Sequence, residues 1–308
     1  MWFSGAGCLA KCPRITRTGH REAEQGANWH LQACWGIFCP CRDGFSRAGS
    51  RWCALSGKRL SDLFRRRKAT EEAPVRASVP DDVFVAAIGD VHGHLDLVEQ
   101  LWQLISDKAR QSQCRHKVLV FVGDYVDRGP RSAALVDRLL QGFDGFETVY
   151  LMGNHDQTLL QFLSDPSVGE VWRNFGGLDT LRSYGITYDP ARGWADTRSA
   201  FALAMPQAHI HFFKNLKLHH VIGDYVFVHA GLRPHVKLED QSAQDLLWIR
   251  EEFLDSDANF GRVVVHGHTP AREPVVRHNR IGIDTGAYMS GKLTALVLEG
   301  RERQFLST

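Results

Sequence analysis

The stretch Val83-Phe84-Val85-Ala86-Ala87-Ile88, followed by Gly89-Asp90, decides the fold. A continuous apolar run of this length is typical of a central strand that is buried on both faces. An amphipathic helical pattern follows it, and similar apolar runs recur at 118–122 and at 148–152 with a second helical pattern between them. Because parallel strands need crossover connections, this order predicts a mostly parallel sheet with helices on its faces.

The chain after residue 152 follows a different pattern. Residues 155–215 look helical and irregular, and we expect them to form an inserted cap region. Short apolar runs punctuated by turns then resume, at 216–222, 225–228, 263–265, 281–283 and 293–298. These runs predict a second sheet that packs on the first.

Composition excludes several classes of protein. Of the 308 residues, 44% are hydrophobic and 23% are charged, which is enough to bury a sizeable core. No run approaches the ~20 apolar residues that span a bilayer, and the formal net charge of +2 is too small to favour nucleic acid as a partner. Six of the seven cysteines lie in the first 53 residues without a secretory signal pattern, so we expect reduced thiols and a cytoplasmic location.

Three regions are expected along the chain. Residues 1–57 lack periodicity and predict either a disordered extension or a segment read from a start codon placed too early. Residues 58–81 are a predicted basic leader and linker. The cationic stretch 58–68 could touch an anionic membrane, but its three apolar side chains favour a solvated leader. Residues 82–308 are the predicted catalytic domain.

Polar clusters follow the ends of the predicted buried strands. Ligands in open α/β sheets bind outside the carboxyl ends of the strands, so these clusters should meet in space. Glycines beside the polar residues allow the backbone to approach a shared centre. The five clusters are Gly89-Asp90-Val91-His92-Gly93-His94, Gly123–Pro130, Gly153-Asn154-His155-Asp156, His229-Ala230-Gly231 and His266–Pro270.

The carboxylate, amide and imidazole side chains of these clusters predict two divalent ions of the first transition row. One ion would be held by Asp90, His92 and Asp124, and the other by Asp124, Asn154, His229 and His268. The shared aspartate fits the ~3.5–4 Å metal spacing of binuclear hydrolases. The positive charges of the two ions and Arg128 exceed the negative charges of two aspartates and a bridging hydroxide. The pocket should therefore bind a phosphoryl group, which that hydroxide attacks.

The motif set resembles one enzyme family. GDVHG, GDYVDRG, GNHD, HAG and GHTP together are similar to the phosphoprotein phosphatase (PPP) family of metallophosphoesterases, nearest to its bacterial and phage serine/threonine phosphatases. The resemblance covers about residues 82–306. It implies an α/β fold, namely a calcineurin-like sandwich of two central mixed sheets flanked by helices (α/β/β/α). It also implies two metal ions, usually Mn²⁺, with Fe or Zn as alternatives.

The resemblance further implies four catalytic roles. Arg128 and Arg250 would hold phosphate oxygens, and His155, polarised by Asp127, would protonate a leaving alkoxide. Asp156 departs from the Glu that usually ends the third motif. Its shorter side chain should change the contact it makes rather than the activity.

These parts predict a metal-dependent phosphomonoesterase that acts on phosphoserine or phosphothreonine in a phosphoprotein or phosphopeptide. A first alternative is a diadenosine tetraphosphate hydrolase, although such relatives typically lack an aspartate at the position of Asp127. A second alternative is an inactive metal-binding module that docks through the basic leader.

Four neighbouring residues have roles that the sequence leaves open. His94 is expected at the surface or at a helix cap, and His266 is left outside the ligand set. Asp284 either orients an imidazole or caps a turn. Tyr288 lies where it could touch the substrate.

Overall fold

The computed structural model describes residues 77–308, and every structural statement below concerns this part of the chain. The predictions for residues 1–57 and for the basic stretch 58–68 lie outside the described residues. Within 77–308, each helix is too short or too polar to cross a membrane. The packed part of the chain begins before residue 82, because Ala77 and Val79 are buried in a core that residues of both sheets share.

The opening stretch forms the middle strand of a five-stranded mixed sheet in the order β10-β9-β1-β2-β3. β1, β2 and β3 pair in parallel, β9 pairs antiparallel with β1, and β10 pairs antiparallel with β9. The strands are Val83–Ile88 (β1), His116–Phe121 (β2), Glu147–Tyr150 (β3), Thr294–Glu299 (β9) and Glu302–Ser307 (β10). β10 was not predicted, because this edge strand begins with three exposed polar residues that hide the apolar alternation.

Side chains of β1 alternate between two cores, as the pleat of a strand requires. Phe84 and Ile88 lie in one core with α1 (Leu95–Gln111) and α2 (Ser132–Leu140). Val85 lies in a second core, between the two sheets. Because apolar neighbours cover both faces, every position of the strand is apolar.

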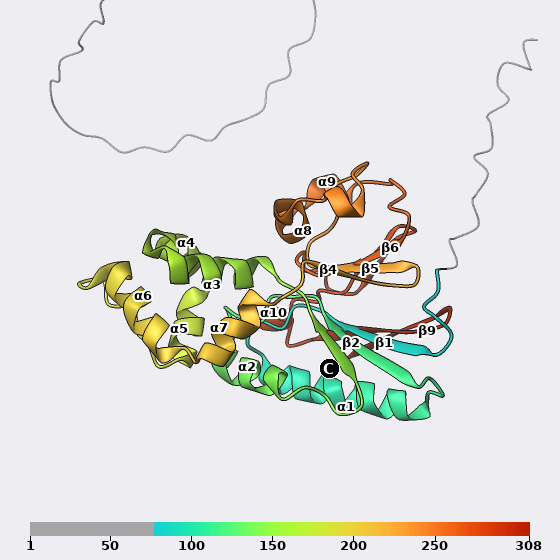
Figure 1. Cartoon of the computed structure of the whole chain (residues 1–308), viewed down its shortest axis with the longest axis horizontal. Helices are drawn as coiled ribbons and strands as arrows, with labels where there is room; N and C mark the ends of the chain where they lie inside the picture. Colours follow the sequence, from blue (N-terminus) through green and yellow to red (C-terminus); the bar gives the residue numbers. More distant parts are fainter. Residues whose placement is uncertain (1–76) are drawn as a thin grey trace, which may run out of the picture. The chain divides into compact units, whose positions relative to one another are not determined.

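The second five-stranded sheet has the order β4-β5-β6-β8-β7 and is also mixed. Its strands are His219–Ile222 (β4), Tyr225–Val228 (β5), Val263–His266 (β6), Val275–Val276 (β7) and Arg280–Gly282 (β8). The helices α8 (Ala243–Trp248) and α9 (Glu251–Leu254) pack on its outer face. Figure 1 shows the resulting layers of helices, sheet, sheet and helices, which confirm the predicted α/β/β/α sandwich.

The expected cap region between β3 and β4 is helical. It contains α3 (Asn154–Ser164), η2 (Pro166–Val168), α4 (Gly169–Asn174), α5 (Gly177–Ser183), α6 (Gly193–Ala204) and α7 (Gln207–Lys214). Two further short helices, η3 (Leu238–Asp240) and α10 (Ala287–Ser290), lie in later loops. Figure 1 shows the cap helices to one side of the two sheets, where α5 and α7 pack against α2.

Candidate active site

The polar clusters meet where the parallel strands end. Asp90 and Asp124 follow β1 and β2, and Asn154 begins α3 after β3. His229 and His268 come from the loops after β5 and β6 of the second sheet. These five side chains are all buried, with at most 6% of their surface exposed. The predicted ligands from both sheets therefore share one buried centre.

The loops that carry these residues have an unusual backbone. His92, Asp124 and His268 have positive φ angles of 46°, 54° and 65°. A left-handed backbone at a residue other than glycine costs about 1–3 kcal/mol and persists only where its surroundings enforce it. Tight packing does so here, because a Cβ atom added to Gly153 would lie 2.1 Å from Asp124 Oδ1.

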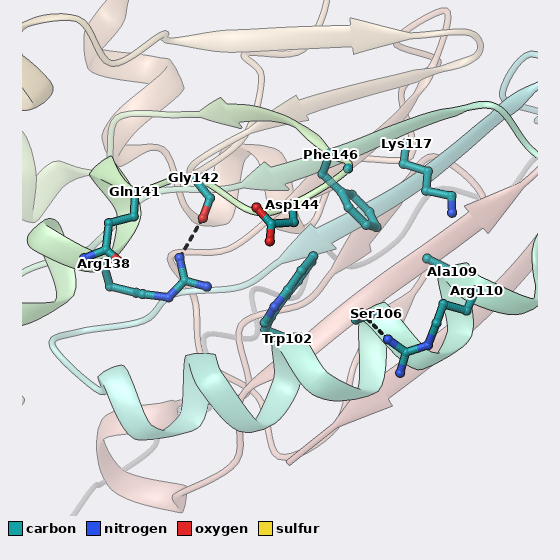
Figure 2. Close-up of a pocket in the computed structure, with 11 residues that line it drawn as sticks. Trp102, Ser106, Ala109, Arg110, Lys117, Arg138, Gln141, Gly142, Asp144 and Phe146 are labelled. Atoms are coloured by element: carbon teal, nitrogen blue, oxygen red, sulfur yellow. Dashed lines mark hydrogen bonds between the residues drawn. The ribbon is translucent and has the colours of Figure 1, made fainter.

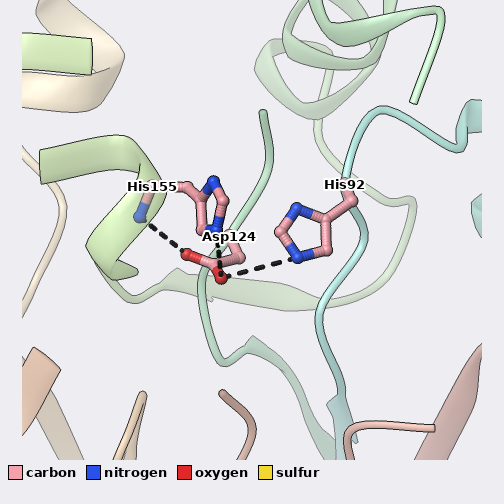
Figure 3. A group of neighbouring side chains, drawn as sticks. All are labelled: His92, Asp124 and His155. Atoms are coloured by element: carbon pink, nitrogen blue, oxygen red, sulfur yellow. Dashed lines mark hydrogen bonds and ion pairs between the residues drawn. The ribbon is translucent and has the colours of Figure 1, made fainter. Parts of the chain in front are cut away.

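The Asp124 carboxylate lies at the centre of the group. Its Oδ2 is 3.6 Å from His92 Nε2 (Figure 3). Its Oδ1 is 3.5 Å from His229 Nε2. Burial disfavours its charge, but the surrounding imidazoles outweigh burial and lower the pKa of Asp124. The two carboxylate oxygens thus face different histidines, as a carboxylate shared between two ions requires.

The Asn154 amide gathers the donors of the second group. Its Oδ1 lies 2.9 Å from His229 Nε2 and 2.9 Å from His268 Nδ1. An amide oxygen and two imidazole nitrogens this close, with Asp124 beside them, form a mixed oxygen and nitrogen donor set. Such a set suits first-row divalent ions better than calcium or structural zinc.

Backbone carbonyls fix the orientation of two imidazoles. His92 Nδ1–H donates to Val126 O and His229 Nδ1–H donates to Val122 O, each at 2.9 Å. The Nε2 lone pairs are thereby left facing Asp124. Burial lowers the pKa of His92 to about 3 and also lowers the pKa of His229. Both rings are therefore neutral at pH 7, as metal ligands must be.

Two buried atoms of the centre lack partners among the described residues. Asp90 Oδ2 accepts a hydrogen bond from His268 N at 2.9 Å, while Asp90 Oδ1 and His268 Nε2 have none. Burial, together with the nearby Asp284 and Asp124 carboxylates, raises the pKa of Asp90 well above its usual value. Clustered carboxylates that destabilise one another are stabilised by a cation. The donors present therefore fit the two divalent ions.

His155 and Asp127 form a buried pair beside this centre. His155 Nδ1–H donates to Asp127 Oδ2 at 2.7 Å, and His155 Nε2 points toward Asp124 at 4.0 Å (Figure 3). Trp172 and Thr180 also donate to Asp127, at 3.0 and 2.7 Å, and so hold its carboxylate in place. Burial opposes the charge of His155, but Asp124 and Asp127 outweigh burial and raise its pKa. The ring is thus suited to carry a proton.

The two arginines reach the centre from its open side. Arg128 is exposed, its Nη1 lies 3.1 Å from His92 Nε2, and its guanidinium lies 4.3 Å from the ring centroid of Tyr288. Arg250 Nη1 donates to Thr269 Oγ1 at 3.5 Å, next to His268. Neither arginine forms a salt bridge within the described residues, so both guanidinium groups are free to bind an anion.

Asp156 has a structural role that the motif alone did not show. Its carboxylate accepts hydrogen bonds from the backbone N–H groups of Asp124 (2.9 Å), Tyr125 (3.0 Å) and Gly153 (2.9 Å). It thereby joins the loop after β2 to the start of α3. Although the third motif usually ends in Glu, the shorter side chain of Asp156 still accepts hydrogen bonds from three backbone N–H groups.

The structure shows the surroundings of the four residues whose roles the sequence left open. Asp284 accepts a hydrogen bond from Gly286 N at 2.8 Å, so it caps a turn. His94 precedes α1 but makes no capping hydrogen bond through its side chain. His266 is buried and points away from the ligand group, against Gly282. The ring of Tyr288 packs on His92 at 5.3 Å between centroids.

A second hollow of about 620 Å³ lies elsewhere and is not part of this site (Figure 2). It is lined by the end of α1, Lys117 near the start of β2 and the loop before β3, far along the strands from Asp124. Two of its three cations already have partners, because Arg138 pairs with Glu99 at 2.6 Å and Arg110 pairs with Asp107.

The sandwich fold and the donor set define a metal-dependent phosphoesterase. The chain belongs to the calcineurin-like phosphoesterase family, which matches residues 85–292. Membership in this family implies divalent metal ions and a hydrolase.

The names of two curated relatives specify a substrate, which the family description does not. The chain is 25% identical over 228 residues to the bis(5'-nucleosyl)-tetraphosphatase PrpE (asymmetrical) of Anoxybacillus flavithermus, across 68% of this chain and 88% of that protein. It is 27% identical over 237 residues to the protein of the same name from Oceanobacillus iheyensis, across 71% and 90%. The comparisons thus confirm the phosphoesterase family but not the serine/threonine phosphatase type that the motifs predicted.

A solved structure supports the fold. A protein described as a presumed diadenosine tetraphosphatase superposes with a TM-score of 0.51 and 23% identity, over 75% of this chain and 98% of that one. At this identity the likeness shows the architecture alone.

Asp124→Asn should lose metal, because the neutral amide cannot serve two ions as a carboxylate does. We expect elemental analysis after dialysis to find less than half of the wild-type metal content. Asp127→Asn is the matched control and should keep its metal, since Asp127 contacts only His155, Trp172 and Thr180 through its side chain. Equal metal in Asp124→Asn and wild type contradicts the bridging assignment.

Asp156→Ala should lower the free energy of unfolding by about 3 kcal/mol, because three buried N–H groups lose their acceptor. Urea denaturation in the presence of a chelator measures this cost apart from metal binding. The exposed Asp196 on α6 provides a control, and Asp196→Ala should change stability by less than about 0.5 kcal/mol. An Asp156→Ala variant as stable as wild type rules out the joining role.

The pH dependence of turnover on an alkyl phosphate should report on His155. The protonated ring is needed, so kcat falls as pH rises through its pKa, which Asp127 raises. Asp127→Asn removes that charge, and the alkaline limb of the kcat profile should move about one unit or more toward lower pH. An unmoved limb means that another group donates the proton.

Proposed function

We propose that this metallophosphoesterase hydrolyses dinucleoside tetraphosphates with two divalent ions, Mn²⁺ first among the candidates. The observation that carries the proposal is that relatives matched over about nine-tenths of their length are named tetraphosphatases. A buried centre with free arginines at its open side supports an anionic, phosphate-rich substrate. When bound, the two ions would supply an acidified water as nucleophile and charge to neutralise the phosphoryl oxygens.

The side chains of this protein would do the remaining work. Arg128 and Arg250 lie on either side of the ligand group and would orient the phosphoryl group to be cleaved. Their charges would also stabilise the additional negative charge of the transition state. Tyr288 packs against the Arg128 guanidinium and would limit its motion.

A second candidate is the serine/threonine protein phosphatase activity predicted from the motifs. The His155–Asp127 pair favours it, because a leaving alkoxide needs a proton whereas a leaving phosphate does not. The complete set of ligand side chains supports an enzyme over the inactive docking module.

One substrate panel tests these proposals. The Mn²⁺-loaded full chain should show a higher kcat/KM for diadenosine tetraphosphate than for a phosphothreonine peptide, and the reverse order would establish the second candidate. His155→Ala should lower kcat about 10²-fold or more on the peptide and much less on the dinucleotide, since the acid assists only the alkoxide. A metal-loaded protein inactive on both substrates and on p-nitrophenyl phosphate would revive the docking module.

A further inference from the structure

The side chain of Arg250, the proposed phosphate clamp, has few contacts of its own. It is exposed, and within 77–308 its one hydrogen bond is the 3.5 Å contact from Nη1 to Thr269 Oγ1. A contact of this length is near the limit for a hydrogen bond. The position of the guanidinium therefore depends on the backbone that carries it.

That backbone joins two short helices. Arg250 lies between α8, which has six residues, and α9, which has four (Figure 1). Its φ and ψ angles of −130° and −102° belong to neither helix. Helices this short do not keep their shape in water without tertiary contacts. The contacts that fix α8 and α9 therefore decide where Arg250 lies.

The loop after β5 supplies many of these contacts. Leu246 of α8 is buried with Leu232 of this loop. The loop also carries His229, and its Ala230 N–H donates to Leu246 O at 2.9 Å. The segment that holds Arg250 thus rests on the loop of a predicted metal ligand.

Arg233, from the same loop, binds both helices through its guanidinium. Its Nε and Nη2 donate to the two carboxylate oxygens of Asp245 on α8, at 3.0 and 2.6 Å. Its Nη1 donates to Glu252 on α9 at 2.5 Å. Asp245 and Glu252 lie on either side of Arg250 in the sequence. One side chain therefore holds both ends of the segment that carries Arg250.

Both partners of the Arg233–Asp245 pair are themselves fixed. Asp245 is 7% exposed, and Ser242 Oγ also donates to its Oδ2 at 2.8 Å. The hydrogen bonds from Arg233 hold the pKa of Asp245 below its usual value, so the carboxylate is charged at pH 7. The N–H of Arg233 donates to Gln241 Oε1 at 2.8 Å, and its C=O accepts from Gln241 Nε2 at 3.0 Å. A two-point arginine–carboxylate pair adds geometric specificity as well as energy.

We propose that Arg233 is a positioning residue for phosphoryl transfer. By holding α8 and α9 to the loop after β5, it sets the position of the Arg250 guanidinium relative to His229. It acts through Arg250 and not on the substrate, because its three guanidinium nitrogens already donate to Asp245 and Glu252. The inference rests on the proposed function only through the clamp role of Arg250, and it holds for either candidate substrate.

A double-mutant cycle on the Mn²⁺-loaded full chain, with p-nitrophenyl phosphate as substrate, tests the inference. Arg250→Gln should lower kcat/KM about 10²-fold, because a charge that stabilises the transition state is lost. Arg233→Gln should lower kcat/KM about tenfold, because the clamp is then misplaced. Adding Arg233→Gln to Arg250→Gln should lower kcat/KM by less than about twofold further, since no clamp remains to be positioned.

Controls separate positioning from folding. Arg233→Gln should keep the wild-type metal content, because His229 retains its hydrogen bond to Val122 O. Arg115→Gln breaks another arginine–aspartate pair, with Asp82, before β2 and at the end of that strand far from Asp124, and should keep the wild-type kcat/KM.

A milder variant serves if Arg233→Gln does not fold. Glu252→Gln removes only the charged contact to α9 and should lower kcat/KM about threefold. This loss should again disappear in the Arg250→Gln background, and it is judged in the same way.

Three results would overturn the inference. An unchanged kcat/KM in folded Arg233→Gln, with Arg250→Gln impaired, removes the positioning role but leaves the clamp role of Arg250. A full additional loss in the double variant means that Arg233 acts by a route other than Arg250. If Arg250→Gln alone keeps the wild-type kcat/KM, the clamp role itself is wrong, and Arg233 has nothing to position.

Discussion

The buried carboxylate of Asp124 is the constraint on which the site depends. It lies after the middle parallel strand of the first sheet, and histidines from both sheets face its two oxygens. A buried carboxylate is stable only beside positive charge or strong donors. The fold brings five loops together around Asp124. Its buried negative charge would destabilise an apolar interior, but here it can be stabilised by divalent ions.

The loops hold that geometry through backbone contacts rather than through long side chains. The carboxylate of Asp156 binds three N–H groups of the loops after β2 and β3. The left-handed φ angles of His92, Asp124 and His268 are tolerated because tightly packed loops enforce them. Asp127 and Arg128 in the same loops also have positive φ, and among the other non-glycine residues of 77–308 only His235 does. The strain is thus concentrated in the loops of the centre, where folding energy from the two sheets preorganises the donors.

The choice of substrate turns on the leaving group. The His155–Asp127 pair is built to supply a proton, which benefits an alkoxide most. The named relatives, in contrast, cleave a substrate whose leaving group is itself a phosphate. A centre that binds phosphoryl groups through metals and arginines serves both reactions, so the surroundings of the centre decide between them.

The alternation of strands and helices could be predicted from the sequence, because β1 and residues 118–121 of β2 are buried on both faces and are uniformly apolar. It also predicted the polar residues of the centre, since each follows directly after a strand. Strand β10 escaped prediction because its exposed residues carry no periodic signal. The roles of Asp156 and Trp172, and the pairing of Arg233 with Asp245 and Glu252, were decided only in the folded chain. Such contacts join residues far apart in sequence, and no local pattern records which buried polar group finds a partner.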